Sequence, residues 1–213
     1  ITVSRMNILI IQRDYLLCYS AGMILPVTVH FDISLLPSLY MPHLNIEFKA
    51  KSNRIEELES LLLQHNPQFI GEDHQVDTYF HVPAGRLKLR EGTIENALIH
   101  YERENTASAK ASHVLLYQHT PDKSLKDILT KTLGIKAVVD KRRKIYFIGN
   151  VKFHFDTVEG LGTFVEVEAI DKDGSIGAEK LQAQCHQYAA LFGITEKDYC
   201  PVSYSDMILE KTK

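Results

Sequence analysis

Residues 45–51 read NIEFKAK, in which polar or charged residues alternate with apolar ones. Four later stretches also place charges at alternate positions. They are RLKLR at 86–90, KRRK at 141–144, VKFHFD at 151–156 and TFVEVE at 163–168. Successive side chains of a strand point to opposite faces, so each stretch predicts a strand with a charged face. An ordinary antiparallel sheet would turn that face to water. Five such stretches instead predict a sheet closed into a barrel around a basic interior that also holds a few acids.

The composition fits one folded domain. The chain has 213 residues, of which 45% are hydrophobic, and this is enough for one sizeable core. Its net charge of −3 does not indicate a nonspecific binder, so we expect no nucleic-acid partner and no membrane partner. Cys18, Cys185 and Cys200 have no metal-type spacing, which favours a reducing compartment and predicts a cytoplasmic protein.

The first forty residues differ from the rest of the sequence. They contain few charges, and their apolar residues follow no sustained period. Arg13 and Asp14 interrupt the apolar residues, so no run reaches the roughly 18 residues that a membrane span requires. We predict that residues 1–40 are an appended leader outside the folded domain and that the domain covers residues 41–213. A signal or anchor is the alternative.

Helices and strands can be predicted from residue 41 onward. Asn53 is expected to cap a helix that ends near Pro67, and further helices are expected at 122–133 and 176–192. Strands are expected at 75–81, 86–91, 97–103, 137–140, 144–148, 151–158 and 163–170, in addition to the stretch at 45–51. Short connections between the strands at 75–103 imply antiparallel pairing. The predicted class is α+β.

The ordered series of motifs resembles the CYTH superfamily, the class IV adenylyl cyclases and thiamine triphosphatases that are also called triphosphate tunnel metalloenzymes. The motifs are NIEFK at 45–49, DTYF at 77–80 followed by GRLKLR at 85–90, KRRK at 141–144, and HFDTVEGLGTFVEVE at 154–168. The resemblance covers about residues 44–209. It implies an eight-stranded antiparallel β-barrel, or tunnel, with helices packed outside.

The resemblance also implies a site. A triphosphate would be clamped by Lys49, Lys88, Arg90, Arg103, Lys141 and Arg143. Mg²⁺ or Mn²⁺ would be held by Glu47, Glu166 and Glu168, because hard cations favour carboxylate oxygens. Glu47 and Tyr101 are the expected catalytic groups.

Each assignment has a simpler alternative. Glu166 and Glu168 would then only form structural ion pairs with interior arginines, and Lys51, Lys152 and His154 would lie at the tunnel mouth.

Two residues depart from the family pattern. The family usually opens with Glu-x-Glu-x-Lys, whereas this chain has Asn45 at the first acid. Hydrolytic members carry a lysine on the strand after the Arg-x-Lys-x-Arg segment, where this chain has Tyr101 or Arg103. A lysine-assisted hydrolysis is therefore in doubt.

Three functions remain open. The first is a metal-dependent phosphohydrolase acting on inorganic triphosphate, a nucleoside triphosphate or thiamine triphosphate. The second is a class IV adenylyl cyclase that forms cyclic AMP and pyrophosphate from ATP. The third is a non-catalytic polyphosphate- or nucleotide-binding module. All three predict a triphosphate-containing small molecule as ligand, and homodimerisation is left open.

Overall fold

The structure is a computed structural model that describes the chain except for residues 1–7, 11–15, 21–22, 25–42, 104–108 and 213. The chain divides into two units, residues 1–40 and 41–213. In the first unit, β1 (Ile8–Ile10), β2 (Leu16–Ser20) and β3 (Met23–Ile24) form a small antiparallel sheet in the order β1-β2-β3.

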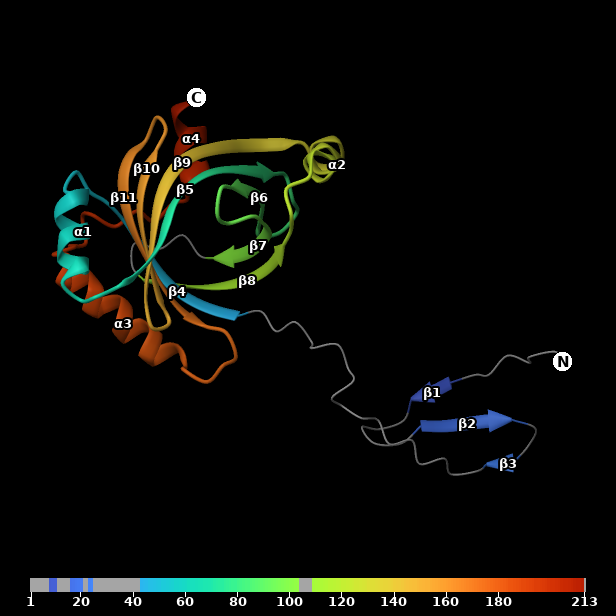
Figure 1. Cartoon of the computed structure of the whole chain (residues 1–213). Helices are drawn as coiled ribbons and strands as arrows, with labels where there is room; N and C mark the ends of the chain where they lie inside the picture. Colours follow the sequence, from blue (N-terminus) through green and yellow to red (C-terminus); the bar gives the residue numbers. More distant parts are fainter. Residues whose placement is uncertain (1–7, 11–15, 21–22, 25–42, 104–108, 213) are drawn as a thin grey trace. The chain divides into compact units, whose positions relative to one another are not determined.

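The second unit is a closed antiparallel barrel with strand order β10-β11-β4-β8-β7-β6-β5-β9 (Figure 1). Its strands are β4 (His43–Lys51), β5 (Gln68–Phe80), β6 (Arg86–Gly92), β7 (Ala97–Arg103), β8 (Lys110–Gln118), β9 (Ile135–Ile148), β10 (Val151–Val158) and β11 (Gly162–Asp171). The eight-stranded barrel and the α+β class predicted from the sequence are confirmed.

The strand register places the charged residues on one continuous face. Residues directly opposite each other on neighbouring strands share a face of the sheet. Glu166 of β11 lies opposite Lys49 of β4 and also opposite His154 of β10. On the other side of the barrel, Arg90 of β6 lies opposite Asp77 of β5. The alternation in the sequence therefore becomes a charged inner surface on β4, β5, β6, β9, β10 and β11, whereas β7 and β8 turn mainly apolar residues such as Ile99 and Val114 inward.

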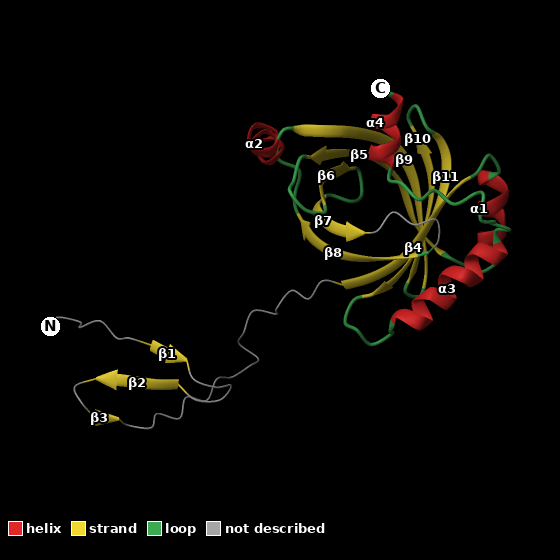
Figure 2. Cartoon of the chain, turned by 180° about the vertical axis from the view of Figure 1, so that it is seen from behind, coloured by secondary structure: helices red, strands yellow, loops and turns green. Residues whose placement is uncertain are grey.

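The outer face of the barrel wall forms the main hydrophobic core. Phe48, Phe153 and Val165 point outward and are at most 1% exposed. They pack beneath α1 (Ile55–Leu63) and α3 (Ala178–Leu191), which cover the same side of the barrel (Figure 2). Burial of one large apolar side chain stabilises a fold by about 1.5–3 kcal/mol, so this layer holds the wall in place around its polar interior.

Two further helices have well-defined ends. Asp122 caps α2 (Lys123–Leu133), because its Oδ1 accepts a hydrogen bond from the Ser124 amide at 2.6 Å. A capping box between Ser203 and Asp206 begins α4 (Tyr204–Lys211). In the described part of the chain, no helix combines the length and the apolar character that crossing a membrane would need.

Two local predictions are wrong, and one strand is missed. The charged run KRRK does not separate two strands: β9 continues through it, with Lys141 and Arg143 buried on the inner face and Arg142 exposed outside. β8 was not predicted, because its outer face is not covered by a helix and includes exposed Leu115 and Tyr117 in place of polar residues. Asn53 does not cap α1, which begins after Arg54 without a side-chain cap.

We predict that a truncated protein beginning at Met41 folds and keeps its ligand binding. The reason is that residues 41–213 contain all eight barrel strands and the core that covers them. Far-UV circular dichroism and a cooperative thermal transition would test this. An insoluble or unfolded truncated protein would place part of residues 1–40 in the domain.

Candidate functional site

The barrel interior is buried and densely charged. Its nearly inaccessible side chains, each at most 7% exposed, are Glu47, Lys49, Asp77, Arg90, Lys141, Arg143, His154, Asp156 and Glu166. A buried charge without a partner is costly, so such an interior is stable only if its charges neutralise one another. They do so in two clusters.

The first cluster is centred on Asp77. Its carboxylate accepts hydrogen bonds from Lys88 Nζ at 3.1 Å, from Lys141 Nζ at 2.7 Å, and from Arg90 Nε and Nη2 at 2.8 and 3.0 Å. Burial opposes ionisation of Asp77, but these cations hold the pKa of its carboxyl group well below the usual range. One carboxylate shared by three cations leaves a local excess of positive charge.

That excess acts on Lys141, whose side chain is 1% exposed. Burial, together with the nearby Arg90 and Arg143 guanidinium groups, lowers the pKa of Lys141 to about 7, although Asp77 opposes the shift. Lys141 therefore takes up or releases a proton near neutral pH. Its charge can respond to an anion that enters the tunnel.

The second cluster is centred on Arg143. Its Nε and Nη2 bind the two oxygens of Asp156 at 2.7 and 2.5 Å, and Nη2 also binds Glu166 Oε2 at 2.8 Å. Tyr204, the first residue of α4, donates its hydroxyl to Asp156 Oδ2 at 2.8 Å. Lys49 Nζ lies 3.8 Å from Glu166 Oε1 and 4.0 Å from the Tyr204 ring centroid. The structural ion pair considered for Glu166 is therefore present.

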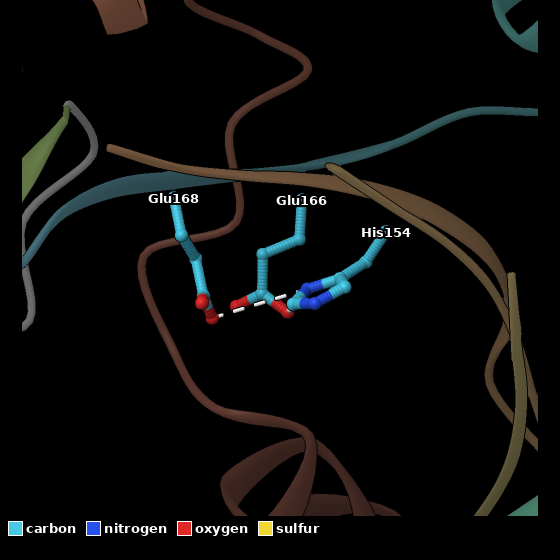
Figure 3. A group of neighbouring side chains, drawn as sticks. All are labelled: His154, Glu166 and Glu168. Atoms are coloured by element: carbon cyan, nitrogen blue, oxygen red, sulfur yellow. Dashed lines mark ion pairs between the residues drawn. The ribbon is translucent and has the colours of Figure 1, made fainter. Parts of the chain in front are cut away.

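A candidate metal centre lies beside this second cluster. His154 of β10 and Glu166 and Glu168 of β11 point toward one another inside the barrel (Figure 3). One donor atom from each lies within 4.8 Å of the others. His154 Nδ1 is 3.6 Å from Glu166 Oε2 and 3.9 Å from Glu168 Oε1, which is too long for a direct hydrogen bond.

The chemistry of this donor set fits a divalent cation. Among the described residues, neither ring nitrogen of the buried His154 has a hydrogen-bond partner. Burial, Arg143 and Lys152 lower the pKa of His154 to about 3, so its imidazole is neutral and keeps a lone pair for a metal. Burial, with the carboxylates of Glu166 and Glu47, raises the pKa of Glu168 to about 7. A cation would relieve this crowding of negative charge.

The other predicted site residues have different surroundings. Glu47 of β4 lies opposite Glu168, on the strand next to the metal-ligand candidates. Tyr101 of β7 lies with its ring centroid 5.8 Å from Lys88 Nζ and 5.9 Å from Arg86 Cζ. Arg103 ends β7, but its side chain lies outside the described residues.

The tunnel-mouth alternative holds for only some of its residues. Lys51 is exposed, and Lys152 is partly buried with its side chain 11% exposed. His154 is 1% exposed and therefore belongs to the interior.

The sequence-based site omitted several residues that define the interior. Asp77 and Asp156 belong to the quoted motifs but not to the predicted site, although each neutralises clamp cations. The alternation of Asp73, Gln75 and Asp77 on β5 could have identified an inward polar face. Glu95 contacts Arg90 from the connection between β6 and β7, and strand periodicity carries no signal for a residue outside a strand.

A closed antiparallel barrel whose inner face is lined by paired cations and carboxylates defines a charged tunnel protein. The CYTH domain matches residues 43–204, which is most of the chain, and the chain belongs to the CYTH family. None of the curated proteins matches it in sequence.

Solved structures share the fold at low sequence identity. The PH1012 protein of Pyrococcus horikoshii is 24% identical with a TM-score of 0.67, over 76% of this chain and 98% of that protein. A candidate adenylate cyclase of Vibrio parahaemolyticus is 19% identical with a TM-score of 0.62, over 78% and 97%. A Hippeastrum candidate adenylyl cyclase, described as having a dominant triphosphatase activity, is 14% identical with a TM-score of 0.52, over 80% and 95%. These similarities establish the fold.

We predict that Lys141→Met changes how stability depends on pH. The pKa of Lys141 is about 7 in the folded protein and near 10.5 without the fold, so between these values the unfolded chain binds more protons. The free energy of unfolding should therefore rise with pH across this window, by up to about 1.4 kcal/mol per pH unit from this group. Urea denaturation from pH 7 to 9 should give a smaller slope for Lys141→Met.

A matched control is Lys131→Met, which removes a lysine from the last turn of α2 outside the barrel. If wild type and Lys141→Met gave the same slope, the low pKa of Lys141 would be wrong.

We also predict that His154 contributes to metal selectivity. An imidazole nitrogen is a softer ligand than a carboxylate oxygen, so the wild-type protein should bind Mn²⁺ more tightly than Mg²⁺. His154→Ala should weaken Mn²⁺ binding by about tenfold or more, measured by electron paramagnetic resonance of the free ion. His186→Ala, which removes an exposed histidine on α3, is the control. Equal Mn²⁺ affinity in His154→Ala and wild type would exclude His154 from the site.

Proposed function

We propose that this protein is a metal-dependent phosphohydrolase acting on a triphosphate, which is inorganic triphosphate, a nucleoside triphosphate or thiamine triphosphate. One observation carries the proposal: the cation clusters around Asp77 and Arg143 share one barrel interior with the donor group His154, Glu166 and Glu168. The first two supply charge for a polyphosphate, and the third supplies ligands for a divalent ion.

Such an interior is suited to phosphoryl transfer, because that reaction depends mainly on holding the phosphates and neutralising their charge. Arg90 and Arg143 offer forked donors, while Lys49, Lys88 and Lys141 act as point charges. The low pKa of Lys141 means that an entering polyanion would favour its protonated form and so increase its own neutralisation. Mg²⁺ or Mn²⁺ held by His154, Glu166 and Glu168 would add charge neutralisation and a Lewis acid.

Glu47 is assigned to the attacking water and Tyr101 to the phosphate that the water attacks. Glu47 lies beside the metal-ligand candidates as the partner of Glu168, where its carboxylate can accept a proton from water. The ring of Tyr101 lies 5.8 Å from Lys88 Nζ and 5.9 Å from Arg86 Cζ, and we assign its hydroxyl to orienting a phosphate oxygen. Tyr101 is on β7, the strand on which hydrolytic members carry a lysine, whereas Glu47 is on β4.

Product analysis tests the proposal against its alternatives. The purified protein is incubated with inorganic triphosphate, ATP or thiamine triphosphate, with Mg²⁺ or Mn²⁺, and the products are separated. Orthophosphate release supports the hydrolase. Cyclic AMP with pyrophosphate would instead support an adenylyl cyclase, and binding without turnover would support a module that has lost catalysis.

We predict that Arg90→Ala weakens triphosphate binding by at least about 1.5 kcal/mol, the low end for a hydrogen bond to a charged group. The fold should survive, because Asp77 keeps Lys88 and Lys141 as partners. Isothermal titration calorimetry gives the affinity and circular dichroism the fold. Arg54→Ala, which removes an exposed arginine paired with Glu57, should bind as wild type does. Unchanged affinity in folded Arg90→Ala would remove Arg90 from the clamp.

A further inference from the structure

Three donors from three strands converge on the side chain of Glu95. Glu95 Oε2 accepts hydrogen bonds from Arg90 Nη1 at 2.9 Å and from Gln75 Nε2 at 3.1 Å, and its Oε1 accepts one from Lys152 Nζ. Arg90 lies on β6, Gln75 on β5 and Lys152 on β10. Two cations and an amide that surround one anionic group form the kind of donor set that also binds a phosphate.

The backbone around Glu95 is fixed, whereas its side chain is only partly buried. The buried Asp73 carboxylate accepts hydrogen bonds from the amides of Ile94 and Glu95 at 2.8 and 3.0 Å. A Cβ at Gly92 would lie 2.6 Å from the Glu95 carbonyl oxygen, so this tight path requires glycine. The Glu95 side chain is 28% exposed, and a rotamer change would move its carboxylate without unfolding the connection.

Glu95 lies on a connection and is partly exposed, unlike other acids that neutralise the clamp cations. Asp77, Asp156 and Glu166, which also pair with clamp cations, lie on strands, and their side chains are at most 8% exposed. Displacing one of them would leave a charge buried in the wall. Displacing Glu95 returns a carboxylate to water, which costs far less.

We propose that Lys152, Arg90 and Gln75 form a phosphate subsite that Glu95 occupies in the free protein and that a phosphate group of the substrate takes over. This inference rests on the proposed function and adds that the Glu95 carboxylate competes with a phosphate group of the substrate. Glu95 neutralises part of the subsite's positive charge until a polyanion enters. The polyanion then exchanges one set of charge-assisted hydrogen bonds for another, and Glu95 moves to solvent.

The test is triphosphate binding to the full-length protein by calorimetry, with chelator present so that no metal contributes. Glu95→Gln keeps the size of the side chain and removes the competing charge. Its affinity for triphosphate should rise about tenfold, the factor that one hydrogen bond to a charged group is worth. Glu91→Gln is the matched control, because Glu91 pairs with Lys126 of α2. It should bind as wild type does.

A double-mutant cycle assigns the gain to the subsite. In a Lys152→Met background the substitution Glu95→Gln should gain clearly less than in wild type, since one of the released donors is missing. If Glu95→Gln unfolds, Glu95→Asp replaces it, because a carboxylate one methylene shorter would hold the two cations less closely and should also bind triphosphate more tightly. If these folded variants bind triphosphate no more tightly than a wild type that still binds it, the competing role of Glu95 alone is overturned. If neither wild type nor variants bind triphosphate with chelator, the titration is repeated with Mn²⁺, and absence of binding there as well overturns the proposed function together with the competing role of Glu95.

Discussion

The charges enclosed by the barrel must neutralise one another, and this requirement governs the rest of the structure. Lys141, Arg143 and Asp77 are at most 3% exposed, so water cannot stabilise them. Asp77 neutralises part of the charge of its three cations, and Asp156 with Glu166 neutralises Arg143. The pairing fixes long side chains in place before any ligand arrives, which lowers the entropy that binding would otherwise cost.

The outer core allows the barrel to carry such an interior. Where a strand turns a charged side chain inward, the residues next to it in sequence point outward. Phe48 and Phe153 are such residues, and they pack beneath the helices α1 and α3. The apolar layer and the charged layer are thus the two faces of the same strands, formed by alternate residues. A shift of one residue in register would exchange them, bury apolar groups in the tunnel and expose charges to the helices, so the pairing is strongly specified.

This coupling explains how much the sequence predicts. The alternation of charged and apolar residues around Lys49, Lys88 and Glu166 predicts the barrel and the side chains that face its interior, because every second residue of these strands points inward. Periodicity fails for β8, whose uncovered outer face is not constrained to be polar, and at KRRK, where outward cations resemble a turn. The ion-pair partner of each charged side chain depends on how the closed barrel arranges the strands in space. The sequence therefore predicts which residues face the tunnel but not that Asp77 binds three of them, nor that Glu95 reaches in from a connection.

Internal neutralisation also determines which anions the tunnel can accept. A singly charged anion can replace at most one internal carboxylate and gains little, since the cation it meets was already paired. A triphosphate carries several charges along its length, so we expect it to contact more than one internal cation, with the near-neutral pKa of Lys141 allowing a further positive charge to form. Asn45 fits the same logic: with an amide in place of the family's first acid, one fewer carboxylate opposes an entering polyanion, while His154 offers a neutral third donor beside Glu166 and Glu168. We therefore expect an interior that is already nearly neutral without a ligand to favour a ligand with many charges.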